Sequence, residues 1–204
     1  MLAVTKYVDV DVTRALLDVG CHELAESRPQ QLWEKAAALA ATVPAPRWHL
    51  VGHLQRNKVR RTLPLVSLVH TLDSRRLLET IEEEAALAGL DCDVLVEVNL
   101  TTDPGRSGAA EADVPLLVAA VASSGHVRLR GLMGMASHPD RPTADARRDF
   151  ARLRELRDRL AGDLPPGTLR ELSMGMSGDF EEAILEGATM IRVGSALVEG
   201  LTGR

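Results

Sequence analysis

The sequence contains few cysteines and no long apolar run. Cys21 and Cys92 are the only cysteines among 204 residues and form no CxxC pair, so a disulfide scaffold and a cysteine-based zinc site lack the residues they need. No stretch approaches the roughly 18 apolar residues of a membrane-spanning helix. The net charge of −5 argues against nucleic acid as a partner, since phosphate binding needs a basic face. These absences favour a cytoplasmic protein with one domain, residues 1–204.

Aromatic residues are also scarce, at 2% of the chain. The core must therefore be built from Leu, Val, Ala and Met. No G-x-S-x-G or P-loop motif occurs, so acyl transfer and ATP use have no support. His49 and His53 share a short spacing, but they fall in a predicted strand and loop, where their rings do not align as on a helix. We therefore predict no metal site.

Short apolar runs alternate with stretches of helical periodicity, a pattern typical of repeated βα units around a parallel sheet. Eight runs have the length of a strand, at residues 2–5, 23–26, 48–52, 65–72, 94–99, 127–133, 169–174 and 189–193. Helical patterns follow at 30–41, 57–63, 74–88, 113–123, 143–161 and 179–186. The first unit also predicts a helix that Asp11 caps and Gly20 ends.

Eight strands favour a closed (β/α)₈ barrel. The length agrees, because such barrels begin at about 200 residues. An open doubly wound sheet is the alternative that the same alternation permits. Asp179 and Glu182 have the spacing of a capping box and predict the start of the seventh unit's helix.

Lys6 follows the first predicted strand directly. In a parallel barrel, functional side chains converge at the carboxyl ends of the strands, where a desolvated lysine can act as an amine nucleophile. The alternative is a lysine at a strand end that extends into water.

Two turns rich in Gly and Ser follow the last two predicted strands, at residues 173–179 and 192–195. In barrels, the loops after strands 7 and 8 often bind phosphate through backbone N–H groups. Ser177 and Ser195 can add hydroxyl donors. Two ordinary βα turns would have the same composition, but the barrel assignment favours a phosphate site.

Arg192 lies beside the second of these turns, in a strand that is otherwise apolar. Burying an unpaired arginine is costly. Arg192 therefore faces a polar site or forms a structural ion pair with a carboxylate.

A lysine after the first strand, a phosphate turn and a buried arginine suit a barrel that holds pyridoxal 5′-phosphate (PLP). At this point the sequence resembles the pyridoxal phosphate homeostasis proteins, whose barrel is similar to the amino-terminal domain of alanine racemase. The matching segments are LAVTK at 2–6, WHLVGHLQRNK at 48–58, HTLD at 70–73, VEVN at 96–99, GRSG at 105–108, RGLMGM at 130–135, LSMGMSGD at 172–179 and MIRVGS at 190–195. They occur in order and cover nearly the whole chain.

The resemblance implies that Lys6 carries PLP as a Schiff base and that Arg192 lies near the ring nitrogen. It also implies that Ser177, Gly194 and Ser195 contact the phosphate. The predicted cofactor site comprises Lys6, Ser27, Ser173, Met176, Ser177, Arg192, Gly194 and Ser195.

The sequence differs from the family in two places. Members usually open with a helix before the first strand, whereas here Met1 adjoins that strand and the barrel is expected to lack the leading helix. The family's Gly-Glu-Asn-Tyr segment is here Ala-Glu-Ser-Arg, so Ser27 replaces the asparagine expected near the phenolic oxygen of PLP.

The function that the resemblance implies is vitamin B6 homeostasis, in which a monomer holds PLP and supplies it to PLP-dependent apoenzymes without an established reaction of its own. A permanently cationic arginine at the ring nitrogen disfavours the pyridinium form that most PLP chemistry uses. The first alternative is a PLP-dependent racemase or lyase. Racemases of this kind use a tyrosine from a partner subunit, and the single tyrosine, Tyr7, is expected on the strand face opposite Lys6. The second alternative is a phosphosugar-binding barrel enzyme.

Overall fold

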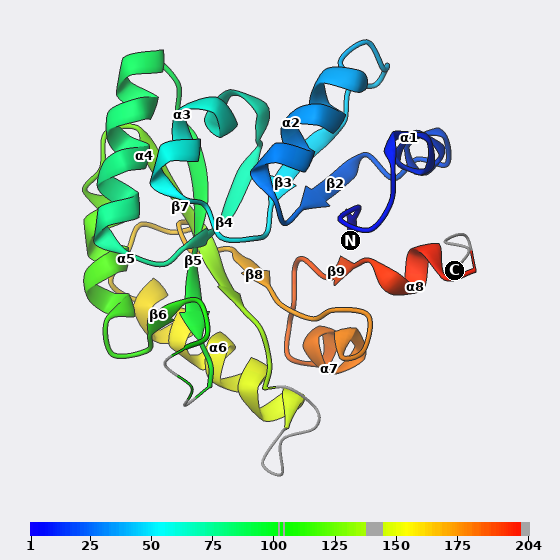
Figure 1. Ribbon diagram of the computed structural model, residues 1–204. Helices are drawn as coiled ribbons and strands as arrows, with labels where there is room; N and C mark the ends of the chain where they lie inside the picture. Colours follow the sequence, from blue (N-terminus) through cyan, green and yellow to red (C-terminus); the bar gives the residue numbers. More distant parts are fainter. Residues whose placement is uncertain (102, 104, 138–144, 201–204) are drawn as a thin grey trace.

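The computed structural model describes residues 1–101, 103, 105–137 and 145–200 (Figure 1). The strands are β1 (Leu2–Val4), β2 (Glu23–Glu26), β3 (Arg47–Leu50), β4 (Leu68–Leu72), β5 (Cys92–Asn99), β6 (Ala109–Ala110), β7 (Val127–Gly134), β8 (Glu171–Ser173) and β9 (Arg192–Val193). The α-helices are α1 (Val10–Asp18), α2 (Pro29–Ala38), α3 (Val59–Thr62), α4 (Arg75–Ala88), α5 (Val114–Ala122), α6 (Ala146–Ala161), α7 (Phe180–Leu185) and α8 (Ser195–Val198). Two 3₁₀ turns, η1 (Arg56–Lys58) and η2 (Leu63–Leu65), flank α3.

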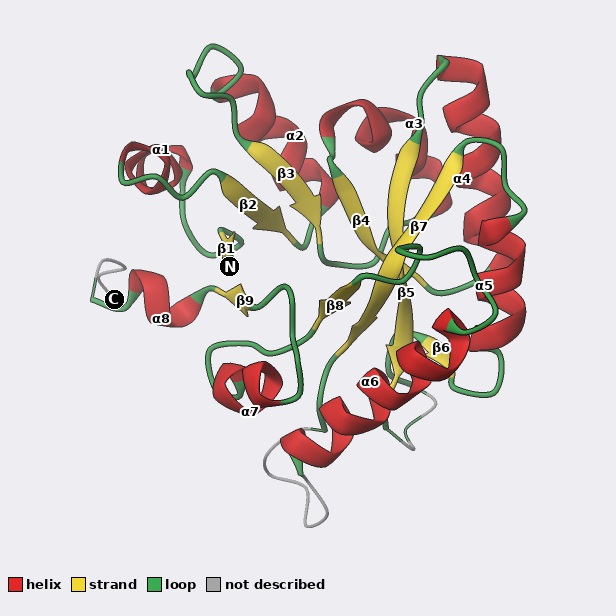
Figure 2. Cartoon of the chain, turned by 180° about the vertical axis from the view of Figure 1, so that it is seen from behind, coloured by secondary structure: helices red, strands yellow, loops and turns green. Residues whose placement is uncertain are grey.

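The strands form one parallel sheet in the order β8-β7-β5-β4-β3-β2-β1-β9. β9 lies beside β1 (Figure 2), and a bridge between Ser173 and Met190 links β8 to the residues just before β9. The sheet therefore closes on itself, and the helices surround it (Figure 1). The predicted (β/α)₈ barrel is confirmed, and the open doubly wound alternative is wrong. No helix in the described ranges has both the length and the apolar character needed to cross a membrane.

The strand predictions are right in number for the barrel, but some of their bounds are wrong. Strand β4 begins at Leu68, three residues later than the predicted strand 65–72. The 3₁₀ turn η2, which contains Pro64, occupies the chain up to Leu65. Strand β6, which pairs with the carboxyl end of β5, was not predicted. Its two alanines carry no alternating pattern.

Helix α4 shows how local sequence sets an element of the barrel wall. The Ser74 side chain accepts a hydrogen bond from the Leu77 N–H, and Gly89 ends the helix in the left-handed conformation, at φ 63°. Leu77, Leu78, Ile81 and Ala85 lie on the buried face of the helix. Their spacing of three and four residues places them on one side of a 3.6-residue turn.

One predicted helix cap is wrong, and a second has the right position without the expected bond. The cap of α1 is Asp9 rather than Asp11, and its carboxylate accepts a hydrogen bond from the Val12 N–H at 2.9 Å. The predicted start of α7 is confirmed, since Asp179 is its N-cap residue, but the Asp179 side chain makes no capping hydrogen bond. Its carboxylate instead accepts a hydrogen bond from the Met176 N–H at 2.6 Å, which orders the turn after β8.

The apolar core has two parts. The larger part lies between the strands and the surrounding helices and includes Phe150, Ile81 and Leu24. The smaller part lies inside the barrel and consists of Leu68, Leu95 and Met133, with Met135 and Met190 packed against it. The remaining interior space is taken by polar side chains, described below.

Gly131 sets the close approach of β7 and β8. A Cβ at this position would lie 1.9 Å from the Glu171 carbonyl oxygen, a distance that backbone atoms cannot tolerate. The same pairing places Met133 beside Ser173. We predict that Gly131→Ala lowers the free energy of unfolding by about 3 kcal/mol, measured by urea denaturation.

The matched control is Gly162→Ala at the end of α6. Its φ of −64° suits any residue, and an added Cβ would meet Arg159 at an ordinary 3.6 Å. This variant should remain within about 0.5 kcal/mol of the wild type. Equal stability of the two variants would contradict the close approach described here.

Candidate functional site

A cavity of about 410 Å³ opens at the carboxyl ends of the barrel strands. This volume falls within the range of small-molecule sites, roughly 300–1,000 Å³. Seven of the eight predicted site residues line it, namely Lys6, Ser27, Met176, Ser177, Arg192, Gly194 and Ser195. The eighth, Ser173, is fully buried and lies behind Arg192, to which it is hydrogen-bonded.

Lys6 lies in the turn after β1, and its side chain is exposed. The desolvation expected for an amine at this strand end is therefore not observed. The Lys6 Nζ lies 4.7 Å from the centre of the Tyr7 ring, and both side chains line the cavity. The prediction that Tyr7 points away from Lys6 is wrong, because β1 ends at Val4 and the alternation of a strand no longer applies to residues 6 and 7.

The turns after β8 and β9 meet at the Ser177 hydroxyl. The backbone N–H groups of Gly194 and Ala196 both donate to the Ser177 Oγ, each at 3.4 Å. Two backbone donors therefore converge on one oxygen atom, an arrangement that can also receive an anionic oxygen. The turn after β9 also packs closely against β1, because a Cβ at Gly194 would lie 3.2 Å from the Val4 carbonyl oxygen.

Arg192 is buried inside the barrel, with 5% of its surface exposed. Its Nη1 donates to the Ser173 Oγ at 2.8 Å, and its Nη2 donates to the Gly134 carbonyl oxygen at 3.1 Å. Burial lowers the pKa of Arg192 to about 10, while the charges of Asp179 and Glu97 raise it. The guanidinium therefore remains cationic at neutral pH. It faces the cavity and is held by neutral acceptors.

A buried polar cluster, which the sequence did not predict, includes Thr5, the residue before Lys6. The Lys35 Nζ, from α2, donates to the Thr5 carbonyl oxygen at 2.6 Å and to the Glu26 Oε1 at 2.5 Å. The Thr5 hydroxyl donates to the same carboxylate oxygen at 2.7 Å. This cluster fixes the carbonyl group that immediately precedes Lys6. A glutamate at the end of an apolar strand was the available signal, but its partner in α2 could not be identified from spacing.

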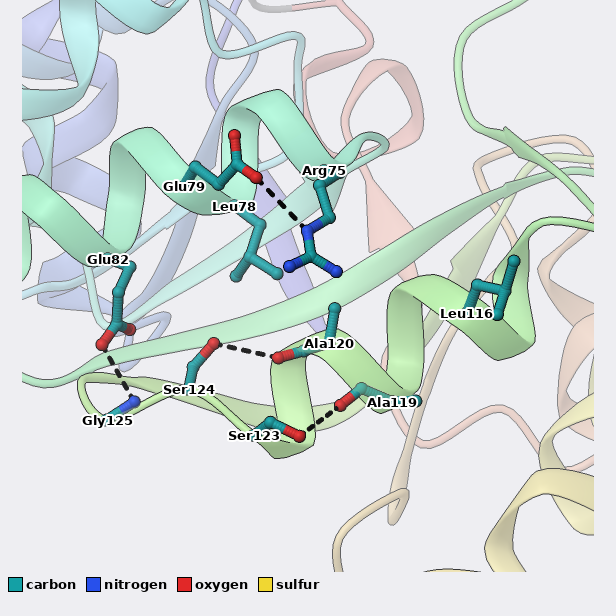
Figure 3. A pocket seen from close by; sticks show the side chains of 10 residues that line it. All are labelled: Arg75, Leu78, Glu79, Glu82, Leu116, Ala119, Ala120, Ser123, Ser124 and Gly125. Carbon is teal, nitrogen blue, oxygen red and sulfur yellow. Dashed lines mark hydrogen bonds and ion pairs between the residues drawn. The ribbon is translucent and has the colours of Figure 1, made fainter.

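Cavity size alone does not identify the site. A groove of about 540 Å³ lies on the outer surface between α4 and α5 (Figure 3). Its polar side chains bond to neighbouring protein groups: Arg75 pairs with Glu79, and the Glu82 carboxylate accepts from the Gly125 N–H. The groove does not combine an amine, a cation and convergent backbone donors, as the barrel cavity does.

The closed parallel barrel and the residues at its carboxyl end define a protein of the alanine racemase N-terminal type. The family model described as "Alanine racemase, N-terminal domain" matches residues 3–201. An alanine racemase from Clostridium difficile shares the fold, with a TM-score of 0.79 at 14% identity over 95% of this chain and 50% of that chain.

Closer relatives specify the family. A pyridoxal phosphate homeostasis protein from Aquifex aeolicus is 36% identical over 97% of this chain and 85% of its own length. The structure of PipY from Synechococcus elongatus with PLP bound has a TM-score of 0.85, at 32% identity over 97% of this chain and 91% of that chain. The chain therefore belongs to the pyridoxal phosphate homeostasis protein family.

The buried Lys35–Glu26 pair generates a stability prediction. Removing one partner of a buried ion pair leaves an uncompensated charge and costs about 3–5 kcal/mol. We predict that Lys35→Met lowers the free energy of unfolding by about 3 kcal/mol in urea denaturation.

The double variant Lys35→Met, Glu26→Gln should recover at least half of that loss, because it no longer buries a lone carboxylate. A double variant that is less stable than Lys35→Met would show that the two side chains do not act as a pair.

Proposed function

We propose that this chain binds PLP as a Schiff base on Lys6 and serves vitamin B6 homeostasis by holding and releasing the vitamer, without turnover of its own. The observation that supports this function is that an amine, a convergent pair of backbone donors and a buried cation line one cavity. In this proposal, Lys6, the Ser177 turn and Arg192 would meet the aldehyde, the phosphate and the ring nitrogen of PLP, respectively.

The cofactor would supply an aldehyde carbon, and the residues of this chain would hold it. Lys6 would supply the amine that holds this carbon through a C=N bond, with the carbonyl oxygen leaving as one water molecule. Ser177, Gly194 and Ser195 would bind the phosphate through hydroxyl and backbone donors. Ser27 lines the same cavity and would face the ring in place of the family's asparagine.

Arg192 supports a binding role over a catalytic one. Its guanidinium is a donor without acceptor capacity, so it favours an unprotonated ring nitrogen. A neutral ring withdraws electrons less strongly than a pyridinium and gives less support to reactions at the amino acid Cα. The exposed position of Lys6 and the adjoining cavity of about 880 Å³ favour exchange of the vitamer with PLP-dependent apoenzymes.

The Schiff base predicts a yellow protein whose colour depends on one lysine. We expect wild-type protein incubated with PLP to show a visible absorption band, and borohydride reduction to label the peptide that contains Lys6. Lys6→Ala should lose both the band and the label. Lys58→Ala is the control, because the Lys58 Nζ lies over the Trp33 ring, 5.4 Å from its centre, outside the cavity.

A colourless wild type after incubation, or a label on another lysine, would refute the proposal. Racemisation or cleavage of amino acids by the yellow wild type, lost in Lys6→Ala, would instead assign the protein to the racemase or lyase class.

The convergent donors at Ser177 predict a selective effect on phosphate binding. Ser177→Ala removes one hydroxyl from the proposed phosphate site. It should raise the Kd for PLP about tenfold, which corresponds to a loss of roughly 1.4 kcal/mol of binding free energy. Its Kd for pyridoxal, which has no phosphate, should change less than twofold. Equal losses for the two vitamers in absorbance titrations would place Ser177 away from the phosphate.

A further inference from the structure

A chain of buried hydrogen bonds crosses the interior of the barrel and ends at Arg192. The Arg192 Nη1 lies 2.8 Å from the Ser173 Oγ, which lies 2.9 Å from the His70 Nδ1. The His70 Nε2 lies 2.9 Å from the His49 Nδ1, and the His49 Nε2 lies 2.6 Å from the Glu23 Oε2. Ser173 and His70 are completely buried, whereas the Glu23 side chain is 37% exposed at the amino end of β2.

When both imidazole rings are neutral, the two ends of this chain determine the direction of every bond in it. Arg192 can only donate, and the Glu23 carboxylate can only accept. His49 therefore donates from its Nε2 and accepts at its Nδ1. His70 in turn donates from its Nε2 and accepts at its Nδ1. The Ser173 hydroxyl must then donate to His70, which leaves its lone pairs for Arg192.

This assignment requires both imidazole rings to be neutral, and their surroundings favour that state. Burial lowers the pKa of His70 well below its usual value, and the neighbouring His49 and Arg192 lower it further. Burial also lowers the pKa of His49, although Glu23 raises it. A neutral imidazole has one donor and one acceptor, as the chain needs.

We propose that His70 and Ser173 are positioning residues that hold the Arg192 guanidinium toward the ring nitrogen of bound PLP. This inference rests on the proposed function. His70 accepts the Ser173 proton at its Nδ1 and thereby keeps the hydroxyl lone pairs directed at Arg192. Without that acceptor, the hydroxyl is free to rotate its proton toward the guanidinium, and Arg192 loses one of its two anchors inside the barrel.

The test compares PLP binding in variants that break or preserve the acceptor at position 70. His70→Leu and Ser173→Ala remove the contact, whereas His70→Asn keeps an oxygen acceptor near the Nδ1 position. The control is Thr62→Val, which loses a buried hydroxyl hydrogen-bonded to Lys58 and Trp33, outside this chain of bonds. Purified proteins that retain the wild-type circular dichroism spectrum are titrated with PLP.

We expect the Kd for PLP to rise about tenfold in His70→Leu and Ser173→Ala, as for the loss of one hydrogen bond to a charged group. A less firmly held Arg192 also suppresses protonation of the ring nitrogen less well. The pH midpoint of the absorbance change of bound PLP should therefore rise by about one unit in these variants. In His70→Asn and Thr62→Val, the Kd for PLP should stay within about twofold of the wild-type value, and the pH midpoint should equal that of the wild type.

Unchanged affinity and pH midpoint in both His70→Leu and Ser173→Ala would overturn the positioning role while leaving the proposed function intact. Failure of the wild type to bind PLP would refute the proposed function. The bond directions can still be tested without PLP, by ¹⁵N nuclear magnetic resonance of the imidazole rings. Protons on the Nε2 atoms of His49 and His70 support the inference, and a proton on either Nδ1 overturns it.

Discussion

The buried guanidinium of Arg192 is the constraint on which the interior of this barrel depends. A cation cannot leave water unless its N–H groups find acceptors, and here the acceptors come from neighbouring strands: the Ser173 hydroxyl at the end of β8 and the Gly134 carbonyl oxygen at the end of β7. Both are available because β7 pairs with β8, and a bridge between Ser173 and Met190 joins β8 to the residues just before β9, so that closure of the sheet brings Arg192 beside these two acceptors. The apolar cluster inside the barrel is correspondingly small, since polar side chains occupy the space beside it.

Local sequence was sufficient for the architecture and for the rim of the site. The period of the apolar residues and the turn-forming glycines and serines are properties of a few consecutive residues, and they predicted the eight barrel strands and most helix positions. Once the barrel was assumed, Lys6, Ser177 and Arg192 could be placed at one end without further information, because parallel strands present their carboxyl ends to the same side. The start of β4 and the cap of α1 were not fixed in this way, because a 3₁₀ turn occupies the beginning of the apolar run before β4 and two aspartates, Asp9 and Asp11, lie at the start of α1.

The residues that support the site from behind the cavity depend on which strands become neighbours. No local sequence pattern predicts which strands these are. His70 and Ser173 are 103 residues apart in the sequence, and their contact exists only because the barrel closes. The same reason explains why Lys35 was read as part of a helical stretch rather than as the partner of Glu26. Tyr7 shows a different kind of error. The alternation of side chains along β1 was applied to residues that follow the end of the strand at Val4, so the Tyr7 side chain was predicted on the wrong side.

Barrels of this class commonly separate function at the carboxyl ends of the strands from stability at the amino ends. The hydrogen-bonded chain from Arg192 to Glu23 joins the two ends. A buried polar network is favourable only when every member is satisfied, because one missing acceptor leaves the others with unpaired donors in a medium of low dielectric constant. Glu23 at the amino end therefore constrains the protonation of His49, then of His70, and finally the orientation of the Ser173 hydroxyl at Arg192. The Glu23 carboxylate at one end of the barrel thus helps to hold the Arg192 guanidinium at the other end. Of the residues in this chain of bonds, Arg192 alone lines the cavity.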